Sequence, residues 1–155
     1  MLRILIVAMS LFCGFSYSEC MNQVSEEQKP ESPLIILVSS AMPELSLKAW
    51  ALQAEKTQSK LVIRGFLNNS FQDTYHFIQN FLTKNNLNVE FSIDPEIFSD
   101  YKVSVVPAVL LRDSNEYALV SGDIGLEEAL IKLNHTQSKH LKNLIRKYLD
   151  ALRKT

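Results

Sequence analysis

The sequence predicts an α/β domain followed by a separate basic amphipathic helix. Short apolar runs that are typical of buried strands alternate with segments of helical periodicity. Two late apolar runs flank a tight polar turn, which predicts an antiparallel hairpin at one side of the sheet. The C-terminal segment concentrates its apolar residues on one helical stripe and its basic residues opposite.

Residues 1–18 have the pattern of a secretory signal peptide. Arg3 precedes a nearly continuous apolar run over residues 4–15, and the small residues Ser16 and Ser18 follow. We expect cleavage after Ser18 and export by the Sec route to the periplasm. An uncleaved anchor or a buried first helix is the alternative, but the run is shorter than the ~20 apolar residues of a membrane span. We expect no integral membrane span after the signal is removed.

Residues 19–33 are polar, contain two prolines and lack periodicity, which predicts a flexible tether. The protein has two cysteines, Cys13 in the signal and Cys20 near the new N-terminus, so the mature domain has no internal disulfide. Cys20 is either a lipid-attachment site or an unpaired thiol. Lipidation sites favour a branched apolar residue and a small residue where Tyr17 and Glu19 stand, so we favour the thiol.

The ordered domain is expected over residues 34–134. Residues 34–38 form a continuous apolar run, which predicts a strand covered on both faces. Pro43 and Glu44 suit the first turn of a helix that continues to about Lys56. Residues 61–66 form a second buried strand.

Ser70 is expected to cap a second helix over residues 71–84, whose apolar residues recur at helical spacing. Residues 89–93 alternate between apolar and polar, which predicts a strand with one wetter face. Asp94 is expected to cap a short helix over residues 95–101.

Residues 105–111 predict the next strand, and residues 117–121 predict its hairpin partner after a turn at 113–115. Residues 122–125 lead into a helix over 126–133. The expected order is therefore β-α-β-α-β-α-β-β-α.

Residues 135–155 carry the basic amphipathic helix. Its apolar stripe faces one way, and Asp150 is the single acid among the basic residues. Two interpretations fit: an extra helix packed on the domain with a solvated basic face, or a docking helix for a protein partner or an anionic lipid surface. The candidate docking face consists of Lys139, Lys142, Arg146, Lys147 and Arg153.

Two segments of the domain indicate a particular fold. A buried strand runs into a proline-containing helix start at residues 39–43, and residues 103–107 follow a short helix and enter a strand. This arrangement resembles thioredoxin. In thioredoxin the first position holds a Cys-x-x-Cys pair, activated by the helix N-terminus, and the second holds a cis-proline. The resemblance implies a thioredoxin-like three-layer sandwich with a cis Val106–Pro107 bond. Because the thiols are missing here, we expect no enzymatic activity.

The order of several short phrases narrows this resemblance. The phrases are residues 40–44 with 47, 61–66 with 69–71, 93–98, 103–107, and 121–124 with 128–130. Taken in this order, the set is similar to the TrbC family of F-type conjugative transfer proteins, which are periplasmic pilus-assembly factors. That resemblance implies a role in pilus biogenesis alongside a TraW-like partner, and it implies no catalytic residues.

The position left without thiols is a candidate partner-contact groove. The functional interpretation is a groove that binds an extended peptide through backbone groups and side-chain pockets. The alternative is a loop that persists because the fold requires it. The groove would consist of Ser39, Ser40, Ala41, Met42 and Pro43 opposite Val106 and Pro107.

Other chemistry is not indicated. The net charge of −1 favours neither nucleic acid nor membrane. His76, His135 and His140 do not have metal-ligand spacing, no phosphate-binding glycine loop occurs, and we expect no cofactor. Arg64 is a ligand-binding cation, the partner of a buried carboxylate such as Asp94, or an ordinary strand-end arginine in water; we favour the ion pair over the ligand site.

The leading hypothesis is a non-enzymatic assembly factor in the periplasm. The alternatives are a thioredoxin-like oxidoreductase, which would need a thiol at residues 39–42, and a chaperone-like binder of extended pilin or envelope peptides.

Overall fold

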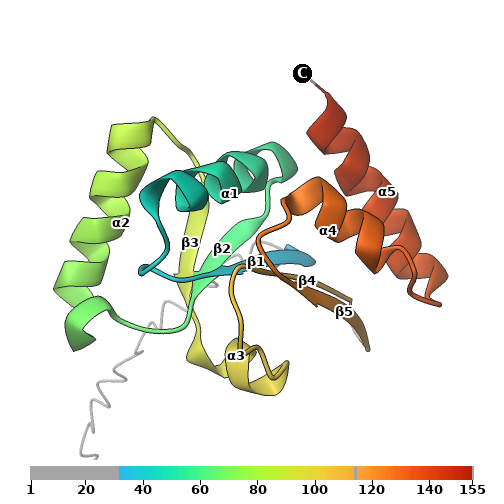
Figure 1. The fold of residues 1–155 in the computed structure, drawn as a ribbon, viewed down its shortest axis with the longest axis horizontal. Helices are drawn as coiled ribbons and strands as arrows, with labels where there is room; N and C mark the ends of the chain where they lie inside the picture. Colours follow the sequence, from blue (N-terminus) through green and yellow to red (C-terminus); the bar gives the residue numbers. More distant parts are fainter. Residues whose placement is uncertain (1–31, 114, 155) are drawn as a thin grey trace, which may run out of the picture. The chain divides into compact units, whose positions relative to one another are not determined.

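A computed structural model describes residues 32–113 and 115–154 (Figure 1). The expected signal peptide, nearly all of the expected tether, and Cys20 lie outside the described residues. The strands are β1 (Leu34–Val38), β2 (Lys60–Ile63), β3 (Glu90–Ile93), β4 (Ala108–Asp113) and β5 (Glu116–Ser121). The helices are α1 (Glu44–Thr57), the 3₁₀ turn η1 (Leu67–Asn69), α2 (Phe71–Asn85), α3 (Pro95–Asp100), α4 (Leu126–Leu133) and α5 (Lys139–Arg153).

The strands of the described residues form one mixed sheet in the order β3-β2-β1-β4-β5. β1 pairs in parallel with β2, and β2 pairs in parallel with β3. β1 also pairs with β4 in the antiparallel sense, with Ile36 opposite Val109, and β4 continues into β5 as an antiparallel hairpin. The predicted α/β class and the late hairpin are therefore confirmed.

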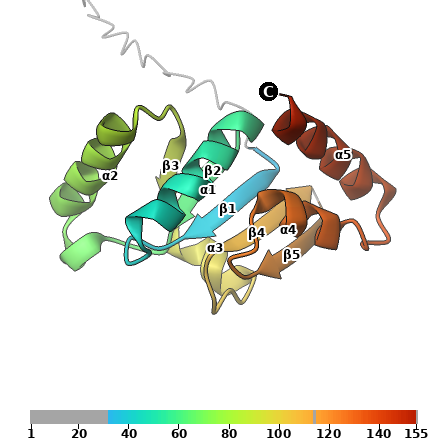
Figure 2. The same ribbon diagram turned by 45° about the horizontal axis from the view of Figure 1, so that its top comes forward.

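Both faces of the sheet are covered by helices. On one face Leu34, Ile36 and Val38 pack in a core with residues of α1, α2, α4 and α5. On the other face Ile35 and Leu37 pack with residues of α3. Figures 1 and 2 show α3 on the opposite side of the sheet from α1 and α4. The result is the thioredoxin-like three-layer arrangement, and it explains why β1 is apolar at every position.

α2 and α3 each begin at a residue whose side chain accepts hydrogen bonds from the first turn of the helix. The Ser70 hydroxyl accepts from the amide of Asp73 at 3.1 Å. The Asp94 carboxylate accepts from the amides of Glu96 and Ile97 at 3.0 and 3.2 Å. Each bond satisfies an amide that has no partner within its helix, so both predicted N-caps are confirmed.

β4 begins later than the sequence predicts. The expected strand start at Val105 was wrong, because the ladder with β1 and β5 begins at Ala108 and Val105 is 56% exposed. Pro107 has no N–H to donate to a ladder. The Val106–Pro107 bond is cis, as expected, and the Pro107 carbonyl accepts from the Gly122 amide at 2.9 Å.

β2 ends earlier than expected, at Ile63. Arg64, Gly65 and Phe66 were assigned to this strand, but all three are exposed and the pairing with β1 and β3 ends at Ile63. The backbone therefore leaves the sheet at Arg64, which places that side chain at the end of the sheet.

α5 packs on the domain through its apolar stripe. Leu141, Ile145 and Tyr148 are buried in the same core as α1 and α4, and α5 contacts both helices. Figure 1 shows α5 beside α4. α5 is thus part of the packed domain, and its apolar face is covered by the core that it shares with α1 and α4.

Burial raises the pKa of the Tyr148 hydroxyl on α5, while hydrogen bonds with the Ser32 side chain and the Leu34 backbone partly oppose the increase. The phenol therefore keeps its proton to a higher pH in the folded protein than in the unfolded chain.

We predict that Ile145→Ala lowers the free energy of unfolding by about 2–5 kcal/mol, because it removes a fully buried side chain and leaves a cavity. Lys147→Ala, on the exposed side of the same helix, is the control and should change it by less than about 0.5 kcal/mol. Urea denaturation measures both. Equal, small effects would mean that α5 does not dock on the domain.

We predict that Tyr148 makes the protein less stable in alkali. Its pKa is raised in the folded state, so above about pH 10 the unfolded state releases the proton first. The free energy of unfolding should fall as pH rises through the folded pKa, and this part of the fall should disappear in Tyr148→Phe. Denaturation at pH 8 and pH 11 measures it. Tyr75→Phe, which removes the same hydroxyl at an exposed site, is the control variant.

Candidate functional site

Residues 39–43 form a tight loop between the end of β1 and the start of α1. The Met42 amide donates to the Ser39 carbonyl at 3.1 Å, and the Ala41 amide donates to the Ser39 hydroxyl at 3.2 Å. The Ser39 amide points to the Met42 sulfur at 3.5 Å. Groups within the loop therefore satisfy some of its backbone amides by hydrogen bonding, and its shape does not depend on a disulfide.

One hollow lies beside this loop at the ends of β1 and β2. It has a volume of about 170 Å³, and its lining includes Ser39, Ser40, Arg64, Phe98 and Val106. The structure thus brings together three of the predicted groove residues: Ser39, Ser40 and Val106.

Met42 lines a second hollow. It lies between α1 and α2, has a volume of about 270 Å³, and is lined mainly by apolar side chains, including Leu47, Phe77 and Phe81. Ala41, Pro43 and Pro107 line neither hollow. Pro107 is buried, whereas Ala41 and Pro43 are exposed. Of the residues that the sequence places in one groove, three therefore line the first hollow, Met42 lines the second, and the other three line neither.

An ion pair bridges the rim of the hollow between α1 and α2. Lys84 Nζ lies 2.7 Å from Glu44 Oε1. The hydrogen bond and the charge of Lys84 lower the pKa of the Glu44 carboxyl. Both side chains are exposed, so the pair links α1 and α2 at this rim but adds little to stability.

Arg64 is held by α3 and by the segment that follows it. Its guanidinium donates to the Val103 carbonyl and lies with Cζ 5.0 Å from the centroid of the Phe98 ring. Asp94, the partner expected from the sequence, instead caps α3. Sequence reasoning missed this arrangement because the position of α3 against the end of β2 is a tertiary feature.

The basic residues of α5 differ in their surroundings. Arg153 donates to Glu127 of α4 through Nε and a terminal nitrogen, both at 3.0 Å. Lys142 is half-buried, whereas Lys139, Arg146 and Lys147 are exposed. The part of the candidate docking face most open to a partner therefore consists of Lys139, Arg146 and Lys147.

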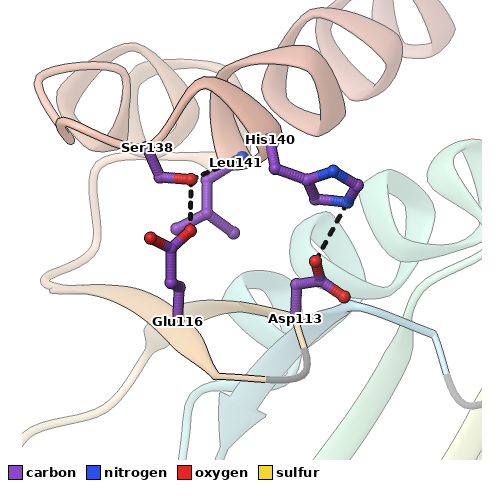
Figure 3. A network of polar contacts seen from close by, with 5 residues as sticks. All are labelled: Asp113, Glu116, Ser138, His140 and Leu141. Carbon is purple, nitrogen blue, oxygen red and sulfur yellow. Dashed lines mark hydrogen bonds and ion pairs between the residues drawn. The ribbon is translucent and has the colours of Figure 1, made fainter.

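The N-terminus of α5 is tied to the β4–β5 hairpin (Figure 3). The Ser138 hydroxyl accepts from the Leu141 amide at 3.2 Å and donates to the Glu116 carboxylate. His140 Nε2 lies 3.0 Å from Asp113 Oδ2. These contacts hold the N-terminal turn of α5, where the basic face begins, against the β4–β5 hairpin. The sequence indicates only an ordinary surface histidine at position 140 and carries no signal for its partner.

The described residues hold neither a metal-binding cluster nor a membrane-spanning helix. No group of three or more metal-ligating side chains comes together among them in a way that could hold an ion. None of their helices combines the length and hydrophobicity that crossing a membrane requires.

Residues 36–133, from β1 to the end of α4, match the profile of the family described as type-F conjugative transfer system pilin assembly protein, TrbC. The protein belongs to this family. The matched segment contains both the 39–43 loop and Pro107, and it ends before α5.

A curated relative is the periplasmic protein TrbC of Escherichia coli K12. It is 29% identical to this TrbC-family chain over 115 residues, which are 74% of this chain and 54% of the relative. The chain therefore spans about half the length of that relative.

Two solved structures are also similar to this TrbC-family chain. StoA from Bacillus subtilis has a TM-score of 0.38 and 16% identity, over 57% of this chain and 73% of that one. A secreted Mycobacterium tuberculosis disulfide oxidoreductase homologous to E. coli DsbE has a TM-score of 0.41 and 15% identity, over 76% of this chain and 79% of that one.

We predict that Lys84→Gln raises the pKa of the Glu44 carboxyl toward its ordinary value, because Lys84 supplies both the largest hydrogen-bond and the largest charge effect on that group. Lys48→Gln should raise it less, since Lys48 acts on Glu44 through its charge alone and more weakly than Lys84 does. Carboxyl ¹³C shifts followed through an acid titration measure both variants. A larger effect from Lys48→Gln would contradict the bridge between α1 and α2.

Proposed function

We propose that the protein is a non-enzymatic assembly factor of an F-type conjugative, type IV secretion system. It acts in the periplasm, in pilus biogenesis, through contacts with other proteins. The family match over residues 36–133 is the observation that carries this proposal. The signal-like pattern of residues 1–18 and the name of the E. coli relative support the compartment.

The chemistry of the 39–43 loop supports a role in binding. Residues 32–154 contain no cysteine, and the loop at the start of α1 holds Ser39, Ser40, Ala41 and Met42. Disulfide exchange requires a thiolate as nucleophile, which these side chains do not provide. Turnover of insulin disulfides by the purified protein would contradict a non-enzymatic role and favour the oxidoreductase alternative.

Two surfaces are the proposed contacts. One is the 39–43 loop with the hollows on either side of it, and the other is the exposed basic face of α5. A TraW-like conjugation protein is the partner that the family resemblance implies. The hollow beside Ser39 and Val106 also favours a second candidate function, the binding of extended pilin segments, because an extended segment can place single side chains into such hollows.

The basic face of α5 is best tested by charge reversal. Removing α5 would take away Leu141, Ile145 and Tyr148 and expose the core residues that they cover, so a truncated protein would test stability as well as binding. Reversing exposed charges leaves that core intact.

We predict that Arg146→Glu with Lys147→Glu lowers recovery of a TraW-like partner by about tenfold, because it places repulsive charge on the proposed dock. The measurement is a quantitative pulldown with mass spectrometry, from envelope extracts of cells carrying an F-type conjugative system. The control is Lys56→Glu with Lys102→Glu, an equal charge change at exposed residues outside α5. Recovery equal to wild type in both variants would exclude the α5 face as the dock.

A further inference from the structure

Arg64 is oriented before any ligand arrives. Its guanidinium donates to the Val103 carbonyl and lies over the ring of Phe98, which is itself 3% exposed. A guanidinium has five N–H donors, and the Val103 bond uses one of them. A cation held in this way loses less side-chain entropy on binding than an arginine extended into water.

The hollow beside Arg64 has the chemistry of an anion site. Among the described residues that line it, Arg64 is the only charged one, and Ser39, Ser40 and Ser104 contribute hydroxyls. The Ser39 oxygen already accepts from the Ala41 amide, so its O–H remains to donate. One cationic residue and three serines therefore line the same small space, together with apolar residues, and this lining includes no carboxylate.

The size of the hollow limits what it can hold. Its volume of about 170 Å³ equals roughly five or six waters at ~30 Å³ each. Pockets for drug-sized molecules are larger, about 300–1,000 Å³. The hollow therefore suits one side chain or the end of a polypeptide. Gly65 also lines it, and a Cβ built there meets nothing within 4 Å, so the approach on that side is open.

We propose that this hollow binds a carboxylate carried by an extended segment of a partner protein. Arg64 supplies the charge and two or more N–H donors, and the serine hydroxyls complete the hydrogen bonds. A single fork-shaped cation matches a monoanionic carboxylate in bidentate geometry. The carboxylate belongs to an Asp or Glu side chain or to the C-terminus of a polypeptide. The proposal rests on the proposed function in one respect only, namely that the ligand is a protein.

The test is an NMR titration of the ¹⁵N-labelled protein with three N-acetylated peptides. The first is Ala-Val-Glu-Val-Ala amide, the second has Gln in place of Glu, and the third is the Gln peptide with a free C-terminus. The Glu peptide should shift the amides of Ser39, Ser40 and Gly65 and bind at least ~10-fold more tightly than the Gln amide. Tight binding of the third peptide would identify a C-terminal carboxylate as an acceptable source. Equal affinity of the first two, with the third no tighter, would overturn the proposal.

Variants of Arg64 provide an independent arm. Arg64→Gln should weaken binding of the Glu peptide ~10-fold or more and leave that of the Gln peptide unchanged, and Arg64→Lys should lie between it and wild type. Lys56→Gln, at the far end of α1, should match wild type. Wild-type affinity of Arg64→Gln for the Glu peptide would overturn the proposal. The comparison of the three peptides uses the wild-type protein, so it tests the proposal even if an Arg64 variant does not fold.

The two proposals fail separately. If the Glu and Gln peptides bind alike while the partner is still recovered from envelope extracts, the carboxylate subsite is overturned and the assembly role stands. If the Glu peptide binds selectively while insulin is turned over, the non-enzymatic role is overturned and the subsite stands.

Discussion

The burial of β1 on both faces is the constraint on which the rest of the structure depends. All five residues of the strand are fully buried, with Leu34, Ile36 and Val38 on one side and Ile35 and Leu37 on the other. Leaving either side in water would forgo roughly 1.5–3 kcal/mol for each large side chain. Helices must therefore cover both faces, and the loops that connect them to β1 must gather at its ends. For this reason the 39–43 loop follows the end of β1, and Arg64 follows the end of the neighbouring strand β2.

α5 shows how one amphipathic helix can serve the fold and remain available for binding. Its apolar stripe completes the core beside α1 and α4, so it stabilises the domain. Its opposite face keeps Lys139, Arg146 and Lys147 exposed, while Arg153 is held by Glu127. The contacts of Ser138 and His140 with the β4–β5 hairpin hold the start of the helix in place. A basic surface on a rigid support is preorganised, which lowers the entropic cost of binding a partner.

The loop at the start of α1 separates two hollows of different chemistry. The side toward α2 is apolar and is lined by Met42, Phe77 and Phe81. The side toward α3 combines apolar side chains such as Ile63 and Phe98 with serine residues and the charged Arg64. A partner that lies across the loop would therefore meet an apolar contact and a cationic one a short distance apart. Such a pairing favours specificity, because a segment that lacks either an apolar or an anionic group in the right place leaves one of the two hollows without a matching contact.

The sequence by itself determined the α/β class, the order of the elements and the N-caps at Ser70 and Asp94, because periodicity and capping are local. It also carried the family, through the order of phrases within residues 36–133. Only the tertiary structure decided where β4 begins, since that depends on pairing with β1 and β5. The tertiary structure also separated Met42 from the hollow that Ser39, Ser40 and Val106 line. It gave Arg64 the partners Val103 and Phe98 in place of Asp94. These features depend on how α2 and α3 pack against the sheet, and no local pattern in the sequence encodes that packing.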